Sequence, residues 1–333
     1  MTPLAVVSAL GLAALLGVSD APNAAAALLA ARTGSYRGVA AWSFVWHVAG
    51  GLLAGEAVAR TVVGIVHVGA KLESPVLVAA CLTAVGFTWL TTNRGLPTSA
   101  SVGLVGGLAG AGFAAGGARA VTWGGLSGSR LVGVLGVLVG ILLAPFLAAL
   151  VSGLVDQFAR QGAYRLRRSA RRELNAALWL ASAAVAVSDG SNDGQKAMGI
   201  LAVVVSGTGS LATGGGIAFW ERLSCAVVLG AFTVLGGRKV VARVSRGLAR
   251  AGAVDDLSAQ CASAGVIMVA AAVGLPLSTS TVVTSAMVGA GISGRRRHVR
   301  WAGVIEIFLV WTLTVPACAA VAAGLFDVVR RLQ

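Results

Sequence analysis

Charged side chains are scarce in this chain. Only 11% of its 333 residues are Asp, Glu, Lys or Arg, and just 12 of them are acidic. A soluble globular domain carries about 25% charged residues, so this composition excludes an ordinary water-soluble fold. Apolar runs at 131–155 and 302–326 exceed the roughly 20 residues that a helix needs to cross a bilayer. We therefore expect an all-α polytopic membrane protein with roughly ten membrane-crossing or membrane-embedded helices.

Cysteine, histidine and aromatic residues are also few. The four cysteines stand in apolar sequence without paired spacing, which favours packing roles over a metal site or a disulfide framework. Aromatic residues make up 6% and are not interleaved with basic residues, so the net charge of +14 does not indicate nucleic-acid binding. Of the three histidines, His47 stands on an apolar face and is expected to be structural.

The basic residues gather in three short tracts between apolar runs, at 160–172, 238–250 and 295–300. Such tracts are typical of cytoplasmic loops that follow the positive-inside rule. We interpret 160–172 as a cytoplasmic linker between a first transmembrane repeat, 1–159, and a second, 173–333. Contact of this linker with anionic membrane lipid is a further role open to it.

Two short polar patterns occur twice, in the same order, inside apolar sequence. The first reads Gly17-Val-Ser19-Asp20-Ala-Pro22-Asn23 and returns as Gly190-Ser191-Asn192-Asp193-Gly194-Gln195-Lys196. The second reads Gly95-Leu96-Pro97-Thr98-Ser99-Ala100-Ser101 and returns as Gly274-Leu275-Pro276-Leu277-Ser278-Thr279-Ser280. Nearly equal offsets indicate a duplicated half, with a polar site between the halves. Several apolar segments are too short to span alone, which predicts broken or re-entrant helices.

The Asp patterns have the chemistry of a cation site. Asp20 and Asn23 would share one helix face, and Pro22 would interrupt the helix and free a carbonyl. These oxygens suit a small cation such as Na⁺, while a protonated Asp20 could carry H⁺ instead. The second copy offers the same ligand types, from Asn192, Asp193 and Gln195. A charge in the bilayer costs roughly 2.5–3.5 kcal/mol, so we interpret both copies as cation-binding, with Na⁺ the candidate metal ion at Asp20 and Asp193.

The Pro-Ser patterns have the chemistry of an anion site. In each copy a Leu-Pro precedes the hydroxyls and an apolar, helix-like run follows, which predicts a helix N-terminus. The hydroxyls belong to Ser99 and Ser101 in the first copy and to Ser278, Thr279 and Ser280 in the second. Free N–H groups, the positive end of the helix dipole and hydroxyl donors bind anions, so two such ends could hold one tetrahedral oxyanion. Ordinary helix capping is the alternative for either copy.

Charge balance links the two kinds of site. An oxyanion near a carboxylate is repelled by roughly 4 kcal/mol at 4 Å and intermediate dielectric. Lys196 offsets one of the two carboxylate charges at most. Anion binding becomes favourable if each Asp first takes a cation, which is the physical basis of symport.

These residues resemble the inorganic phosphate transporter (PiT) family. The first-half motif of that family is matched by Gly17, Asp20, Asn23 and Ala24. Its second-half motif is matched by Gly190, Asn192, Asp193, Gln195, Lys196, Met198 and Gly199, and its Pro-Val-Ser-Thr-Thr-His motif corresponds to Pro97–Val102 and Pro276–Thr281. The resemblance covers essentially the whole chain.

The resemblance implies an inverted-repeat membrane fold that moves phosphate with Na⁺ or H⁺. It implies cation contacts at Asp20, Asn23, Asn192 and Asp193, and phosphate contacts at the paired Ser and Thr residues. Gln195 and Lys196 are taken as supporting residues. We expect no enzymatic activity, no cofactor beyond the coupling ion, and a multi-pass protein of the plasma membrane. Both a single chain and a homo-oligomer are compatible with the sequence.

The chain departs from the family pattern at a few positions. Ser19 replaces an Asn and shortens one cation ligand, and Asp189 replaces the His before Gly190. Ala100 replaces a hydroxyl residue, while Val102 and Thr281 replace the His that ends each Pro-Ser motif. Because the second Asp motif keeps the full pattern, we expect the second half to hold its cation more firmly.

Three other functions are open to such a chain. A permease for another oxyanion, such as sulfate, would use the same hydroxyls and amides. A membrane-embedded hydrolase would use Asp20 and Asp193 as an acid–base pair. A channel would conduct the anion passively through the same site.

Overall fold

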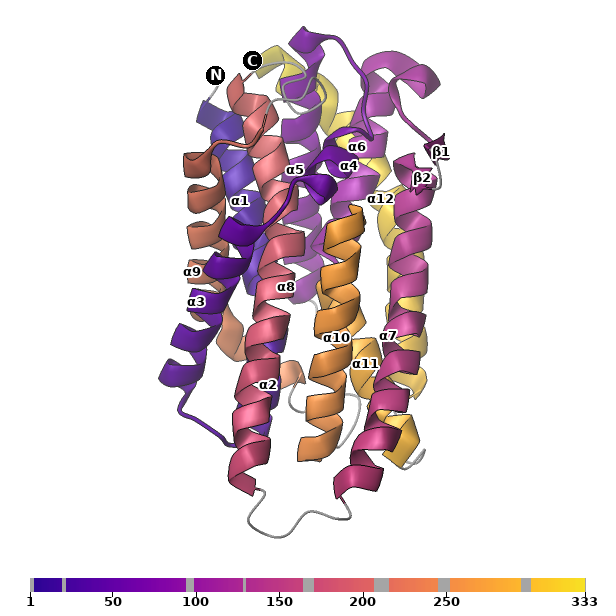
Figure 1. The fold of residues 1–333 in the computed structure, drawn as a ribbon. Coiled ribbons are helices and arrows are strands. Elements are labelled where there is room, and N and C mark those ends of the chain that lie inside the picture. Colours follow the sequence, from indigo (N-terminus) through magenta and orange to yellow (C-terminus); the bar gives the residue numbers. More distant parts are fainter. Residues whose placement is uncertain are drawn as a thin grey trace.

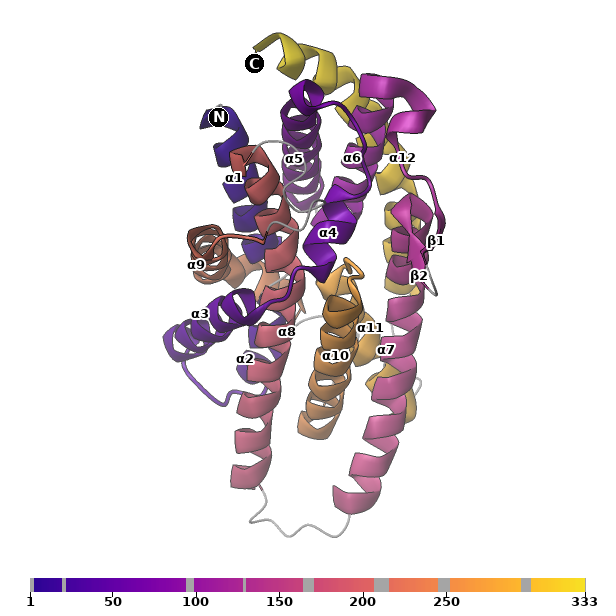
Figure 2. The same ribbon diagram turned by 45° about the horizontal axis from the view of Figure 1, so that its top comes forward.

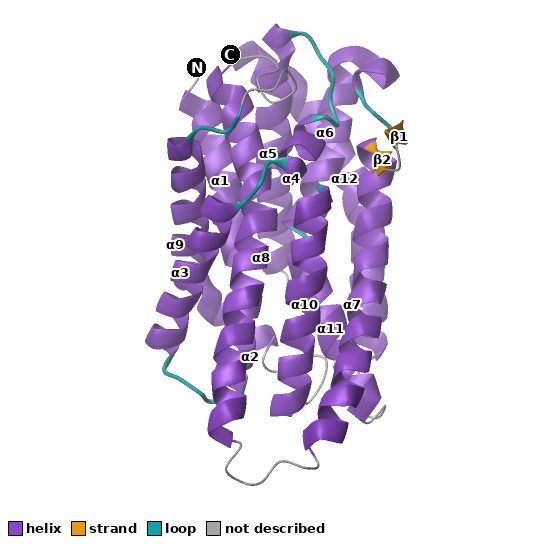
Figure 3. Cartoon of the chain, in the orientation of Figure 1, coloured by secondary structure: helices purple, strands orange, loops and turns teal. Residues whose placement is uncertain are grey.

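The chain forms a long bundle of helices (Figure 1, Figure 3). The computed structural model describes residues 3–19, 22–93, 99–127, 130–163, 171–206, 216–244, 252–294 and 301–332. The first half contains α1 (Pro3–Ser19), α2 (Pro22–Ala30), α3 (Tyr36–Leu53), α4 (Ala57–Val63), α5 (Ala70–Asn93), α6 (Ala100–Gly116) and α7 (Gly133–Ala163). The second contains α8 (Arg171–Ser206), α9 (Phe219–Val244), α10 (Ala253–Val273), α11 (Thr279–Gly294) and α12 (Trp301–Leu332). A short helix η1 (Gly117–Ala120) and a hairpin of β1 (Gly125–Ser127) and β2 (Arg130–Val132) join α6 to α7.

The helices have the length and composition of membrane spans. Within the described ranges, six candidate spans meet both criteria: Pro3–Leu29, Ala70–Thr92, Ala100–Ala120, Gly133–Gln161, Ala253–Val273 and Thr312–Leu332. The α3–α4 pair, bent by 75° at a short break, could form a seventh span. The expected all-α polytopic membrane fold is therefore confirmed, and the bent pair is one of the predicted broken helices.

The two halves interlock in a reciprocal pattern. Helix α6 packs on α12 and α11 packs on α7, while α1 packs on α9 and α8 packs on α3. In sequence order, α8 corresponds to α1–α2, α9 to α3, α10 to α5, α11 to α6 and α12 to α7. The contact of α6 with α12 therefore corresponds to that of α11 with α7, and the contact of α1 with α9 to that of α8 with α3. The hairpins α5–α6 and α10–α11 lie toward opposite ends of the bundle (Figure 1, Figure 2). This arrangement is the inverted repeat that the resemblance implied.

Helix α8 corrects one expectation about helix breaks. The apolar segments 174–187 and 197–218 are predicted as separate helices, but α8 runs unbroken for 36 residues through the polar motif between them. The second motif has no proline, and its amide oxygens accept from backbone N–H groups of other elements. In the first copy, residues 20–21 lie outside the described residues, so the interruption predicted at Pro22 stays a prediction.

Helices α3 and α8 touch backbone to backbone. A Cβ at Gly190 would lie 2.3 Å from the carbonyl oxygen of His47, and a Cβ at Gly50 would lie 2.2 Å from that of Val187. Only glycine fits at either position, because any side chain would force the two helices apart. Small residues permit such close approach in membrane bundles. The contact fixes His47 directly beside the turn of α8 that begins the polar motif.

The ends of α7 and α10 meet at the lower end of the bundle in Figure 1, beside the start of α8. Arg160 in the last turns of α7 bonds to Asp156, at 2.7 Å, and to Asp255 in the first turn of α10. These ends border two of the basic tracts. Most of the predicted linker 160–172 lies outside the described residues, because only its two ends fall within α7 and α8.

The cysteines follow the packing prediction with one exception. Cys81, Cys225 and Cys318 are buried and carry free thiols, whereas Cys261 is exposed. Cys261 lies on α10 between the buried Gln260 and Ala262, on the face of the helix that also exposes Met268. The packing prediction is wrong for this cysteine, because apolar neighbours in a membrane chain can face either protein or lipid.

Candidate ion and anion site

Both hydroxyl motifs lie at helix N-termini, as predicted. Helix α6 begins at Ala100, and the Ser99 hydroxyl caps it by accepting from the Val102 N–H at 3.4 Å. Helix α11 begins at Thr279, and the Ser278 hydroxyl just before it lies 2.6 Å from that of Thr281. The first turn of each helix has N–H groups without intrahelical partners, and the dipole makes this end positive. Residues 94–98, including Pro97, lie outside the described residues.

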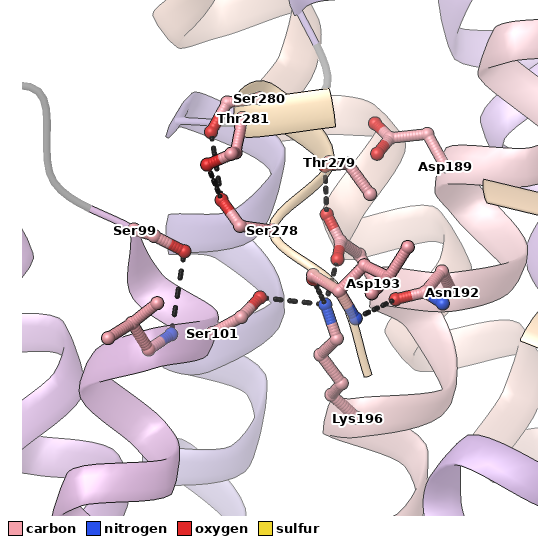
Figure 4. A network of polar contacts seen from close by, with 12 residues as sticks. Ser99, Ser101, Asp189, Asn192, Asp193, Lys196, Ser278, Thr279, Ser280 and Thr281 are labelled. Atoms are coloured by element: carbon pink, nitrogen blue, oxygen red, sulfur yellow. Dashed lines mark hydrogen bonds and ion pairs between the residues drawn. The ribbon is translucent and has the colours of Figure 1, made fainter. Parts of the chain in front are cut away.

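Lys196 joins these two helix ends from the middle of α8. Its side chain is fully buried, and its ammonium donates to Asp193 Oδ1, to Ser101 Oγ at 2.7 Å and to the Leu277 carbonyl at 2.5 Å (Figure 4). An ammonium has three donors, and all three are used here. Because Ser101 belongs to α6 and Leu277 precedes α11, the tips of both hairpins meet at this lysine. The sequence indicated only a supporting role for Lys196, and the structure places it at the centre.

Asp193 is compensated within the protein. It is 1% exposed, its Oδ1 contacts the Lys196 ammonium, and its Oδ2 accepts from the Thr279 hydroxyl at 3.1 Å. A buried carboxylate with such partners avoids the large cost of an uncompensated charge. The Lys196 ammonium therefore stands where a bound cation would stand. Thr279, predicted to contact phosphate, donates to the carboxylate instead in this conformation.

The amides beside Asp193 position the neighbouring elements. Asn192 donates to the Leu275 carbonyl at 3.0 Å and accepts from the Leu277 N–H at 3.1 Å, so it fixes the loop before α11. Gln195 accepts from the Val58 N–H at 2.9 Å in the first turn of α4. Asn192 was predicted as a cation ligand and Gln195 as a supporting residue. Here both amide oxygens are used by backbone N–H groups.

The first Asp motif is described only in part. Asp20 and the side chain of Asn23 lie outside the described residues. Within the part of the chain that the structure describes, the Ser19 hydroxyl is buried and finds no hydrogen-bond partner. Helix α2, which follows the motif, is tied to α8 where the Ser182 hydroxyl donates to the Ala24 carbonyl at 2.8 Å. The first motif therefore borders the helix that carries the second.

A second buried carboxylate lies one turn before Asp193 on α8. Asp189 is 2% exposed, and its Oδ2 lies 3.1 Å from Nε2 of the fully buried His47 on α3. The ring is oriented from its other side, because Nδ1 lies 2.7 Å from the Ser43 carbonyl oxygen. His47 is thus a partnered core histidine, as expected. The sequence signal for its partner was the replacement of the family His by Asp189.

Comparisons with known proteins agree on what the chain is similar to. The sequence profile described as the phosphate transporter family matches it twice, at residues 16–179 and 159–322. A probable low-affinity inorganic phosphate transporter of Rhizobium meliloti is 30% identical over 93% of this chain and 90% of its own length. One of Mycobacterium bovis is 31% identical over 98% of this chain and 77% of its own.

The chain is also similar to a more distant relative and to a solved structure. A protein of Bacillus subtilis, also named a probable low-affinity inorganic phosphate transporter, is 27% identical over 97% of this chain and 95% of its own. A solved structure titled the sodium-dependent phosphate transporter shares the fold, with a TM-score of 0.81 over 99% of each chain and 21% identity. The likeness therefore covers both halves and the polar site between them.

Proposed function

The chain belongs to the phosphate transporter family, and from this premise we propose that it imports inorganic phosphate by symport with Na⁺ or H⁺. One observation carries the proposal beyond the family: the positive ends of α6 and α11 meet at Lys196 inside an apolar bundle. Polar and ionisable groups at such depth are costly and mark ion or substrate pathways. The resulting activity is that of a secondary active transporter, not of an enzyme.

Phosphate would bind between the two hairpin tips. Helix N-termini, hydroxyl donors and an ammonium are the groups that bind tetrahedral oxyanions. The hydroxyls come from Ser99, Ser101, Ser278, Thr279 and Ser280, all at or beside the first turns of α6 and α11. Because one hairpin belongs to each half, phosphate bound there would lie on the pseudosymmetry axis, where alternating access rocks one repeat against the other.

Lys196 supplies the coupling in this mechanism. All three of its donors are used, so it can turn to phosphate only by releasing a partner, and Asp193 is its charged one. A released Asp193 would be a bare buried carboxylate beside the anion, with repulsion of roughly 4 kcal/mol at 4 Å and intermediate dielectric. A Na⁺ or H⁺ arriving at Asp193 removes that charge. Cation binding therefore frees Lys196 for phosphate.

The cation ligands in this proposal are those of the two Asp motifs: Asp20, Asn23, Asn192 and Asp193. Asn192 becomes a cation ligand when its amide oxygen exchanges the bond with the Leu277 N–H for one with the ion. The coupling ion is then the only cofactor. Import of phosphate into a cell places the protein in the plasma membrane, where lipid surrounds the two repeats 1–159 and 173–333 and their basic linker.

Uptake of labelled phosphate into proteoliposomes tests the proposal. Na⁺ and H⁺ gradients are imposed separately on wild type, Asp20→Asn and Asp193→Asn. We expect the wild type to accumulate phosphate against its gradient under at least one cation gradient, and both variants to lose this accumulation. Uptake that only equilibrates phosphate would identify a channel. If unlabelled sulfate competes as well as unlabelled phosphate, the substrate class is oxyanions in general and not phosphate in particular.

A further inference from the structure

The buried His47–Asp189 pair is not used by the phosphate mechanism, and its hydrogen bonds contain an unusual constraint. His47 Nδ1 lies 2.7 Å from the Ser43 carbonyl oxygen, which can only accept, and 3.2 Å from the Ser43 hydroxyl, which can donate or accept. The shorter contact, with a pure acceptor, assigns a proton to Nδ1, and the longer one is compatible with that assignment because the hydroxyl can also accept. His47 Nε2 faces the Asp189 carboxyl at 3.1 Å. A neutral imidazole with its proton on Nδ1 has only a lone pair on Nε2. That lone pair would then point at a carboxylate oxygen, which is also an acceptor.

The contact therefore needs one further proton, between Nε2 and Oδ2. Either His47 is an imidazolium that donates to the carboxylate, or Asp189 is a carboxylic acid that donates to the ring. Both forms hold the same single proton and give the pair a net charge of zero. Loss of this proton leaves a buried negative charge on Asp189. The two atoms that then face each other, Nε2 and Oδ2, are both acceptors. The geometry thus describes a site that binds or releases one proton as a unit.

The other oxygen of Asp189 strengthens this interpretation. Among the residues that the structure describes, none donates to Oδ1, although the side chain is almost wholly buried. A purely structural carboxylate is normally satisfied at both oxygens, since an unmet buried acceptor is costly. Asp193, one turn further along α8, shows the satisfied case, with Lys196 on one oxygen and Thr279 on the other.

Among the residues that the structure describes, no other charged side chain bonds to His47 or Asp189. The nearest charges along α8 are Asp193 and Lys196, which compensate each other. The described parts of the helices packed on α3 and α8 carry Arg60, Lys71, Glu73, Glu221, Arg222, Asp255 and Asp256 near their ends, and the thiols of Cys81, Cys225 and Cys261. Arg222 is bonded to Glu56, and Asp255 to Arg160.

We propose that the His47–Asp189 pair is a proton-binding site and that its proton is the coupling ion of phosphate uptake. Asp189 and Asp193 are one helical turn, about 6 Å, apart along α8. With the proton bound, the pair is neutral and phosphate can enter beside Lys196. After the proton leaves, the new negative charge lies one turn from the anion and favours its release. This inference rests on the proposed function, in which a cation at Asp193 frees Lys196. It adds a proton site one turn away, whose neutral form lowers the negative charge close to the bound anion.

Asp189→Asn removes the proton and keeps the contact. The amide of the variant can donate to Nε2 of a neutral His47, so the packing of α3 on α8 is retained. His47→Gln is the second variant, because its amide can donate to the Asp189 carboxylate and so removes the ring that shares the proton. The matched control is Ser188→Ala on the same helix, whose hydroxyl bonds only to the Ala184 and Val185 carbonyls of α8.

Two measurements on proteoliposomes separate coupling from binding. The first is exchange of labelled phosphate at equal phosphate and equal pH on both sides, which needs binding and movement but no driving ion. The second is accumulation with an inward gradient of one pH unit, compared at the same external pH after nigericin collapses the gradient. Valinomycin and equal K⁺ hold the membrane potential at zero in both arms. One coupled proton sustains up to about tenfold accumulation per pH unit.

We expect the wild type and Ser188→Ala to lose about tenfold accumulation when the gradient collapses. Asp189→Asn and His47→Gln should keep exchange within about twofold of wild type and show no response to the collapse. Retained gradient-driven accumulation in both variants would overturn the proposal. Loss of exchange in both would also overturn it, since the pair would then be structural. A wild type driven by Na⁺ alone refutes the proton site only, whereas a wild type driven by neither ion refutes the proposed function.

Discussion

Helix α8 carries two buried carboxylates one turn apart, and their partners differ in kind. Asp193 faces a lysine ammonium that also holds the tips of both hairpins. Asp189 faces a histidine whose other nitrogen is fixed by a backbone carbonyl. The ammonium is bonded to a carboxylate, a hydroxyl and a carbonyl oxygen, whereas the imidazole shares one contact with a carboxyl whose other oxygen has no partner among the described residues. Under the two proposals above, the first carboxylate serves the anion site and the second serves the driving ion.

Removing the charge of Lys196 should have the largest effect. Lys196→Met removes the ammonium that compensates the buried Asp193 carboxylate, and loss of one partner of a buried pair costs about 3–5 kcal/mol. We expect a large fall in the thermal unfolding temperature and no measurable phosphate uptake. The matched control is the double variant Lys196→Met with Asp193→Asn, which should regain stability but not uptake. A double variant as unstable as the single one would show that the lysine acts through packing and not through charge.

Forcing apart α3 and α8 should have an intermediate effect. In Gly190→Ala the new Cβ would lie 2.3 Å from the His47 carbonyl oxygen, so the helices must separate at the histidine pair. Overpacking of this kind costs about 1–3 kcal/mol, measured as loss of thermal stability. In Gly194→Ala, one turn along, the Cβ meets the flexible end of Met198 at 3.2 Å and the Gly51 Cα at an ordinary 3.6 Å, so the change should be nearly neutral. Equal stability of the two variants would contradict the close contact at Gly190.

Loss of the second donor to Asp193 should have the smallest effect. Thr279→Val removes the hydroxyl that donates to Oδ2 at 3.1 Å and nearly keeps the side-chain volume, so its main effect is the loss of one hydrogen bond. Because Lys196 remains, we expect uptake to persist with a KM for phosphate raised about tenfold. Thr279→Ser retains the donor and serves as the control. An unchanged KM in Thr279→Val would mean that Asp193, like Asp189, needs only one donor.

Much of the fold followed from local patterns. The scarcity of charge and the long apolar runs predicted membrane helices, and the two polar patterns at nearly equal offsets predicted a duplicated half. The Pro-Ser patterns predicted the N-termini of α6 and α11, since a capping hydroxyl acts on its own helix. The general expectation that short apolar segments mark broken helices fails for α8, because without a proline nothing local stops this helix.

The site was predictable as a set of residues but not as a set of bonds. The structure brings Asp193, Asn192, Ser101 and Thr279 together at the hairpin tips, while their roles in binding stay predictions. That Asn192 holds the loop before α11, and that Gln195 holds the start of α4, depends on partners 83 and 137 positions away. No local signal reports such distant partners.

The sequence by itself determined the membrane class, the duplication and the residue types of an ion and anion site, because hydropathy and spacing are local properties. Only the tertiary structure decided which charges meet. Lys196 reaches Ser101 and Leu277 because the two hairpins enter from opposite ends, and His47 reaches Asp189 because glycines let α3 and α8 touch. A buried charge takes its role from the partner beside it, and that partner is fixed by packing.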